Sequence, residues 1–189
     1  MPRWGPGLRL VLLCLFGVAL ARPTGQAADT SDSVEYKVKA GYLFNFVKFV
    51  EWPATAFTNA TAPYVIGILG ADPFGPMLEE ALSQQSVNGR SLTVRHLNAG
   101  AAPDGCHVLF ISRSERDRIT EIFSTVGSRP ILTVGETERF GQAGGMLNFT
   151  VVKGQVKLEA NPAAASASGL RISSKLLAAS RTVGSDSPR

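Results

Sequence analysis

Apolar and polar positions divide the chain into short stretches that predict strands and helices in alternation. Three stretches are almost entirely apolar, as in strands buried on both faces: 64–69, 107–112 and 130–134. A fourth, 91–97, alternates between apolar and polar residues after the turn Asn88-Gly89. Further along, 146–152 and 155–160 predict a hairpin closed by Lys153-Gly154.

Helical periodicity occupies most of the intervals between these strands. Helices are expected over 34–51, 73–84, 112–126 and 169–182. Trp52-Pro53 ends the first helix, because a residue before proline is displaced from the helical region. Asp72 is the expected cap of the second helix, and Pro73 its first residue. Residues 161–168 form an alanine- and serine-rich segment of no assigned structure.

This alternation predicts an α/β fold. Strands that are apolar throughout need cover on both faces, so we expect a three-layer αβα sandwich built on a mostly parallel sheet. The C-terminal hairpin adds an antiparallel edge, and the C-terminal helix follows it. No internal repeat or linker divides the chain, so residues 34–183 are expected to form a single domain.

The first 21 residues have the pattern of a cleaved signal peptide. Arg3 and Arg9 precede a short apolar run, and small residues follow it at Ala19 and Ala21. The run is shorter than the roughly 20 apolar residues needed to span a bilayer. Cleavage is expected after Ala21, with a second possible site at Gly25-Gln26-Ala27. Residues 22–33 and 184–189 are then expected to be flexible tails of a periplasmic protein.

Composition excludes several classes of protein. Of the 189 residues, 44% are hydrophobic and 18% are charged, which is typical of a globular domain and not of a disordered chain. The net charge of +4 is small and partly due to the signal peptide, so nucleic-acid binding is not expected. Two histidines and two cysteines predict no metal site or cofactor. After export only Cys106 remains, and it is expected to be buried because an apolar strand follows it.

Motifs for catalysis are missing from the chain, which lacks a G-x-S-x-G elbow, an H-E-x-x-H helix and a P-loop. We therefore expect no enzymatic activity, and surface or loop roles for His96 and His107. A hydrolase would need both histidines near one cleft. An alternative function is a small-molecule-binding module at the carboxyl ends of the strands, near Gly70 and Gly135. The glycine-rich connection 136–145 is interpreted as an ordinary loop.

Two segments carry apolar residues where a polar surface is expected. Phe44 falls between Lys37 and Lys48 on the polar stripe of the first helix. It is either an exposed contact for a partner or a side chain covered by a loop. The last predicted helix has two apolar rows, one with Ile172 and Leu176 and the other with Leu170. Either the core face is wide, or one row is a docking surface.

Several motifs, taken in order, resemble the YfiR-like family of periplasmic proteins. The first is the aromatic-rich stretch Val38–Pro53. The others are Gly67–Gly70 with Asp72–Gly75, Val87–Arg90, Cys106–Ser112, Ile131–Gly135, Gly144–Phe149 and Gly169–Leu177. Together they cover 36–183, nearly the whole predicted domain. Some relatives carry a further cysteine pair near the stretch 140–147, where this chain has none, so redox sensing through a disulfide is not expected here.

The resemblance implies a regulatory αβα sandwich that can dimerise. It implies that the protein represses a membrane-bound diguanylate cyclase by binding the cyclase's periplasmic sensor domain. An outer-membrane OmpA-like lipoprotein would sequester the repressor and so raise cyclic di-GMP and biofilm formation. By position, the residues implied in partner binding are Glu159, Ala165, Leu170, Ile172 and Leu176, with Arg171 and Lys175 as a polar rim.

Overall fold

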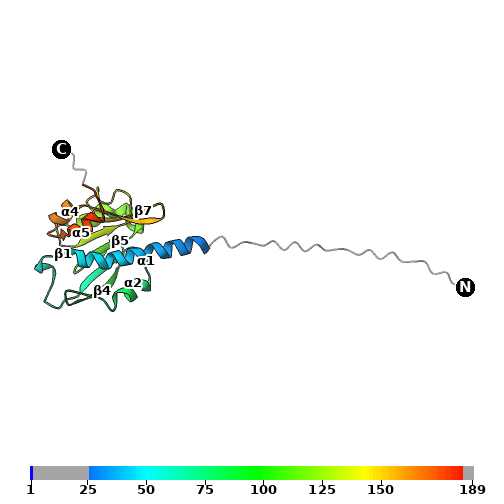
Figure 1. Ribbon diagram of the computed structural model, residues 1–189, viewed down its shortest axis with the longest axis horizontal. Helices are drawn as coiled ribbons and strands as arrows, with labels where there is room; N and C mark the ends of the chain where they lie inside the picture. The colour runs from blue at the N-terminus through cyan, green and yellow to red at the C-terminus, as the bar shows by residue number, and fades with distance from the viewer. Residues whose placement is uncertain (2–25, 185–189) are drawn as a thin grey trace.

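A computed structural model describes Met1 and residues 26–184 of the chain (Figure 1). Residues 2–21 of the predicted signal peptide and residues 185–189 of the predicted C-terminal tail lie outside the described residues. Eight strands of the described residues form one sheet, in the order β10-β8-β7-β6-β5-β2-β4-β3. Their bounds are β2 Tyr64–Leu69, β3 Ser86–Val87, β4 Arg90–Leu97, β5 Val108–Ile111, β6 Leu132–Gly135, β7 Leu147–Val152, β8 Gln155–Ala160 and β10 Arg181–Thr182.

Five neighbouring strands of this sheet, from β4 to β7, are parallel. The chain passes from β2 outward to β4 and then returns to β5 on the other side of β2. This doubly wound order confirms the predicted α/β fold and its mostly parallel sheet. The hairpin strand β8 is antiparallel to β7, as expected. It is not the last strand, however, because β10 pairs in parallel with Glu159 and Ala160 on its outer side.

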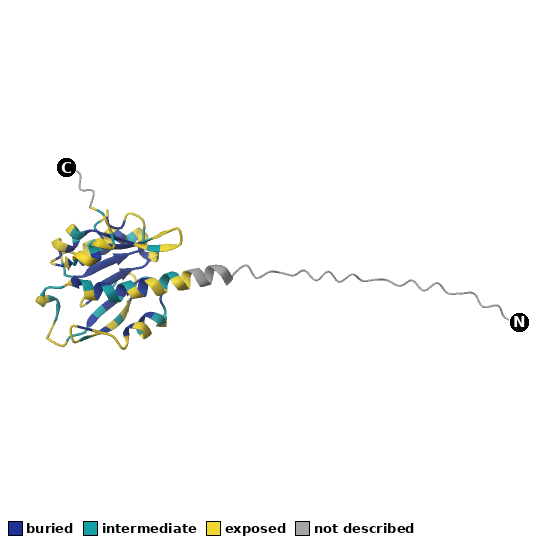
Figure 2. Cartoon of the chain, in the orientation of Figure 1, coloured by how far each residue is buried: buried dark blue, intermediate teal, exposed yellow. Residues whose placement is uncertain are grey.

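Helices cover both faces of the sheet and produce two hydrophobic cores. One face packs against α1 Gln26–Phe49, α2 Pro76–Leu82, α4 Pro162–Ala167 and α5 Ser174–Ala178. The other packs against α3 Ile119–Val126, which the 3-10 helix η2 Arg113–Arg118 precedes. Successive side chains of a strand point to opposite faces of the sheet, so one strand contributes to both cores. In β2, Ile66 and Ile68 face α1, whereas Leu69 faces α3. Figure 2 shows the resulting buried sheet between more exposed helices.

The first helix begins earlier than its periodicity predicts. α1 starts at Gln26 instead of Val34, so the expected tail 22–33 is helical from that residue onward. Figure 1 shows α1 lying across the sheet. Among the described residues, no helix combines the length and apolar character needed to cross a membrane.

The second helix begins later than expected. The Asp72 carboxylate accepts a hydrogen bond of 2.8 Å from the Phe74 backbone N–H and so closes a local turn. Asp72 is therefore not the helix cap. The helix starts after Gly75, which has a positive φ of 54°, and Pro76 is its first residue.

The predicted last helix, 169–182, is wrong. Residues 171–172 form the short strand β9, which pairs antiparallel with β1 (Val50–Glu51) at the end of α1. The Ser173 hydroxyl then accepts a hydrogen bond from the Leu176 N–H and caps the short helix α5. Leu170 and Ile172 are buried while Arg171 between them is exposed, which is the period of a strand. The two apolar rows expected of one long helix do not exist.

Residues 161–168, for which the sequence pattern predicts no helix or strand, contain helix α4. Asn161 accepts a hydrogen bond of 3.0 Å from the Ala164 N–H, and Pro162 occupies the first helical position. These two residues are an ordinary helix-start signal at the sequence level. α4 buries Ala165 completely against the core.

Candidate functional site

The apolar residues implied in partner binding lie inside the molecule. Ala165, Leu170, Ile172 and Leu176 are each at most 7% exposed and belong to the core on the α1 face. They support the C-terminal surface from beneath, since β9 ties Ile172 to Val50 and the Ser173 N–H donates to the Phe49 carbonyl. In this structure these side chains do not form the exposed row that the long helix was expected to present.

The charged residues of the same region do reach the surface. Arg171 is exposed and lies 3.5 Å from the Glu51 carboxylate, in an ion pair that leaves both side chains largely open to solvent. Lys175 is exposed on α5. A shallow groove of about 470 Å³ runs beside Arg171; its lining residues are Glu51, Trp52, Pro53, Ser166, Gly169, Leu170 and Arg171. Glu159 lies apart from this groove, buried on β8 and paired with Arg181.

Phe44, expected to be either an exposed partner contact or a side chain covered by a loop, is neither fully exposed nor fully buried. Its side chain is half-buried and packs against the core on the α1 face. The Lys48 ammonium lies 5.2 Å from the centre of the Phe44 ring. Covering of an aromatic face by a neighbouring cation on the same helix reduces its apolar exposure.

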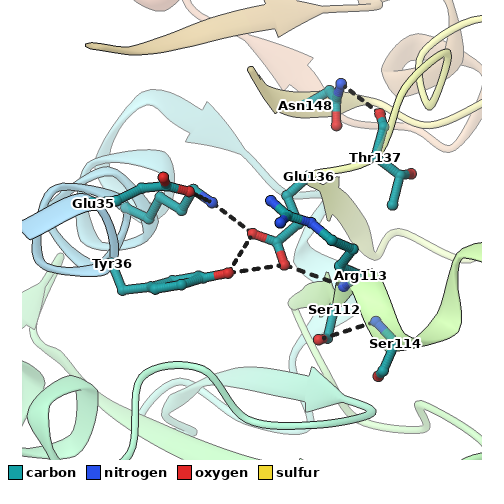
Figure 3. Close-up of polar contacts among 9 residues, drawn as sticks. Glu35, Tyr36, Ser112, Arg113, Ser114, Glu136, Thr137 and Asn148 are labelled. Atoms are coloured by element: carbon teal, nitrogen blue, oxygen red, sulfur yellow. Dashed lines mark hydrogen bonds and ion pairs between the residues drawn. The ribbon is translucent and has the colours of Figure 1, made fainter. Parts of the chain in front are cut away.

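A buried polar cluster around Glu136 was not predicted from the sequence (Figure 3). Lys39, on α1, is 1% exposed, and its ammonium donates to Glu136 at 2.6 Å and to Glu35 at 2.5 Å. The Tyr36 hydroxyl donates to the Glu136 carboxylate at 3.1 Å, and the Arg113 backbone N–H donates at 3.1 Å. The cluster therefore joins α1 to the loops that follow β5 and β6.

The electrostatics of this cluster are those of a structural connection. Burial and the negative charge of Glu136 raise the pKa of Tyr36, so the phenol keeps its proton and remains a donor. Three donors satisfy Glu136, and the opposite charge of Lys39 compensates its burial. The sequence feature that could have indicated this cluster is Lys39, a lysine at an inward-facing position of α1. Its partner Glu136 lies 97 residues further along the chain.

The strand ends at Gly70 and Gly135, expected to be candidate ligand sites, differ in the free space around them. A side chain added at Gly70 would lie 2.4 Å from the Ser114 hydroxyl, so the carboxyl end of β2 is filled by the η2 segment. Beyond Gly135, by contrast, a cavity of about 620 Å³ opens beside Glu136. The glycine-rich connection has a packing role, because added side chains at Gly135 and Gly145 would overlap the buried Phe140 ring.

The two histidines lie in separate environments. His96 is exposed near the carboxyl end of β4, with Nε2 2.6 Å from Glu79. His107 lies in the bend that precedes β5, which agrees with the expected loop role, but its side chain is 4% exposed and so is not at the surface. It contacts the aromatic rings of Trp52, Phe57 and Tyr64. The common cleft that a hydrolase would require of these two histidines is therefore not formed.

Acidic pH is expected to destabilise the protein through His107. Its Nδ1 accepts a hydrogen bond of 3.1 Å from the Val65 N–H, which requires a neutral ring, and burial together with the nearby Arg90 charge lowers the pKa of His107. The unfolded chain therefore binds a proton near pH 6.5 that the folded chain binds only at lower pH. Stability is complete above about pH 6.5 and falls as the pH drops below it.

Urea unfolding of the protein and of His107→Asn between pH 7.5 and 5 tests this dependence. The asparagine carbonyl oxygen takes the position of Nδ1, so it can still accept a hydrogen bond from the Val65 N–H, but it does not titrate. We expect the free energy of unfolding of the variant to fall less steeply with acidification, while exposed His96 is common to both proteins. Equal slopes would show that His107 does not carry the pH dependence.

Cys106 is buried, as predicted, and lies 3.0 Å from the Arg95 guanidinium. Burial raises the pKa of the Cys106 thiol, which keeps it protonated and weakly nucleophilic. Within the described residues, no group of three or more His, Cys, Asp or Glu side chains is placed to hold a metal ion.

Comparison with known proteins identifies one family. A family model described as YfiR/HmsC-like (DUF4154) matches residues 36–181 of the chain. The match begins at Tyr36 of the Glu136 cluster and ends at Arg181, the first residue of β10, so it includes all the other strands of the sheet and both cores. No curated protein matches the chain closely enough to count as a relative.

Proposed function

Because the chain belongs to the YfiR/HmsC-like family, we propose that it is a periplasmic repressor of a membrane-bound diguanylate cyclase. In this proposal it binds the periplasmic sensor domain of the cyclase and thereby limits cyclic di-GMP synthesis and biofilm formation. It acts by protein–protein contact and has no turnover of its own. The family match over 36–181 is the observation that carries the proposal. The signal-peptide pattern of the first 21 residues supports a periplasmic location.

We place the partner contact on the C-terminal surface around β9 and α5. The exposed Arg171 and Lys175 and the adjacent groove at Trp52 supply the contacts. Buried Leu170 and Ile172 act indirectly, because they hold the backbone that presents Arg171. Cationic side chains at an interface rim speed association with an acidic partner and set its orientation. The proposal extends to an OmpA-like outer-membrane lipoprotein that competes for the repressor, and to a homodimer.

Reversing the charge at Arg171 and Lys175 is expected to abolish cyclase binding. Tagged protein is incubated with solubilised membranes of the source bacterium, and retained proteins are identified by mass spectrometry. We expect a cyclase with a periplasmic domain to be retained, and the double variant Arg171→Glu/Lys175→Glu to retain at least about tenfold less. Both side chains are exposed, so the variant should keep the unfolding midpoint of the parent.

Lys37→Glu is the matched control, since Lys37 is exposed near the middle of α1, about three helical turns before the helix ends next to β1 and β9. It should retain the cyclase as the parent does. Retention of a cyclase by the double variant at the parental level would disprove the proposed surface. If the parent protein retains no cyclase, the proposed function is wrong.

A further inference from the structure

The cavity of about 620 Å³ beyond Gly135 lies at the carboxyl ends of β5 and β6. Residues 113–120 form one side of it, and residues 136–143 form the other. In doubly wound sheets this edge, where the loops after parallel strands converge, is where small ligands bind. The cavity is at the opposite end of the strands from the proposed partner surface, because Trp52 in the groove of that surface donates to the His107 carbonyl, which precedes β5.

Three arginines line this cavity with donors that the protein itself leaves largely unused. The Arg113 guanidinium makes no hydrogen bond or ion pair with any described residue, and Arg139 uses only Nε, which donates to Gln142 at 3.0 Å. Arg116 lies 3.7 Å from its neighbour Asp117, with both side chains mostly exposed. By contrast, the nearby Arg118 is fully engaged with Glu115 and Glu121.

Among the described residues, the acidic side chains of the cavity accept no hydrogen bond from these three guanidiniums. Glu136 is paired with Lys39, which it shares with Glu35, and its oxygens already accept hydrogen bonds from Lys39, Tyr36 and the Arg113 backbone N–H. Asp117 and Glu138 are exposed at the rim. The guanidinium donors therefore remain available to an anion from solution.

The remaining wall of the cavity is apolar or weakly polar. Ile119 and Phe140 contribute apolar surface that is continuous with the core on the α3 face, and Ala143 extends it. Thr120 and Thr137 add hydroxyl groups. A site of this composition favours a ligand that combines an anionic group with a small apolar body, since each part finds a complementary surface.

We propose that this cavity binds a small organic oxyanion, held by the guanidiniums of Arg113 and Arg139 and by the apolar wall at Ile119 and Ala143. Carboxylates and phosphate esters share the required chemistry, because a guanidinium donates two parallel hydrogen bonds to either group. The site is separate from the surface proposed for the cyclase. Its test therefore succeeds or fails independently of the proposed function.

Calorimetric titration with phenyl phosphate, benzoate and inorganic phosphate, at constant ionic strength, tests the proposal. We expect saturable binding of phenyl phosphate or benzoate, and weaker binding of inorganic phosphate because it has no apolar part. Arg113→Gln/Arg139→Gln should weaken the organic probe at least about tenfold. Both arginines are exposed, so the unfolding midpoint should not change; if it does, the single variant Arg139→Lys replaces the pair.

Arg171→Gln is the matched control, because Arg171 is equally exposed but lies at the other end of the sheet. It should bind the probes as the parent does. The proposal is overturned if neither organic probe binds, or if the cavity variants bind as tightly as the parent. It is also overturned if Arg171→Gln weakens binding to the same extent, since the attraction would then be general surface charge.

Discussion

Lys39→Met is expected to lower the free energy of unfolding by about 3–5 kcal/mol, the usual cost of removing one partner from a buried ion pair. The substitution would leave the Glu136 carboxylate, whose side chain is 1% exposed, with only the neutral donors of Tyr36 and Arg113. Because Glu136 joins α1 to the loop after β6, the loss should fall on the docking of α1 (Figure 3). Urea denaturation, monitored by circular dichroism, measures this change in the free energy of unfolding.

Two further variants serve as comparisons for Lys39→Met in the Lys39–Glu136 ion pair. Lys37→Met removes an exposed lysine from the same helix and should change stability by less than about 0.5 kcal/mol. Glu136→Gln should be the milder change at the pair, since Lys39 keeps Glu35 at 2.5 Å as a partner. A loss below about 1 kcal/mol for Lys39→Met would contradict the buried pair and indicate that the Lys39 ammonium reaches water.

Leu170→Asp is expected to unfold the protein, with a loss of about 4 kcal/mol or more. Leu170 is 2% exposed in the core formed by α1, α4 and the sheet, so the substitution buries an unpaired carboxylate and removes an apolar side chain. Thermal unfolding of the purified variant, with its circular dichroism spectrum at low temperature, provides the measurement.

Leu170→Met and Arg171→Asp are the controls for this result. The methionine conserves volume and polarity and should cost less than about 1.5 kcal/mol. The aspartate at exposed position 171 adds the same charge one residue further along β9, so it should leave the fold intact. A Leu170→Asp variant as stable as the parent would mean that this side chain is exposed.

The burial of Leu170 and Ile172 changes how a loss of repression must be interpreted. If Leu170 and Ile172 formed the exposed contact that the family resemblance implies, Leu170→Asp or Ile172→Asp would abolish repression by breaking a contact with the cyclase. With both side chains at most 7% exposed, each substitution acts first on folding. Arg171 and Lys175 are the residues whose replacement can test the interface without this effect.

Local chemistry determined most of the sheet. The strands over 64–69, 91–97 and 155–160 and the turn at Lys153-Gly154 follow from apolar runs, alternation and turn residues, all of which act within a few positions. The burial of Cys106 and the α/β class follow from the same patterns. The family resemblance, carried by motifs in order, agrees with the family match over 36–181.

Only the tertiary structure decided the features that depend on distant partners. Residues 171–172 are extended because Val50 and Glu51 offer them a strand to pair with, and this pairing overrides the helical pattern of 169–182. Lys39 is buried because Glu136 meets it from the loop after β6. Glycine is needed at positions 135 and 145 because a larger side chain at either position would overlap the Phe140 ring. The sequence by itself determined a mostly parallel α/β domain with a C-terminal hairpin. Which apolar residues are hidden and which charges are left open was decided by long-range packing, since burial depends on the partners that the fold assembles.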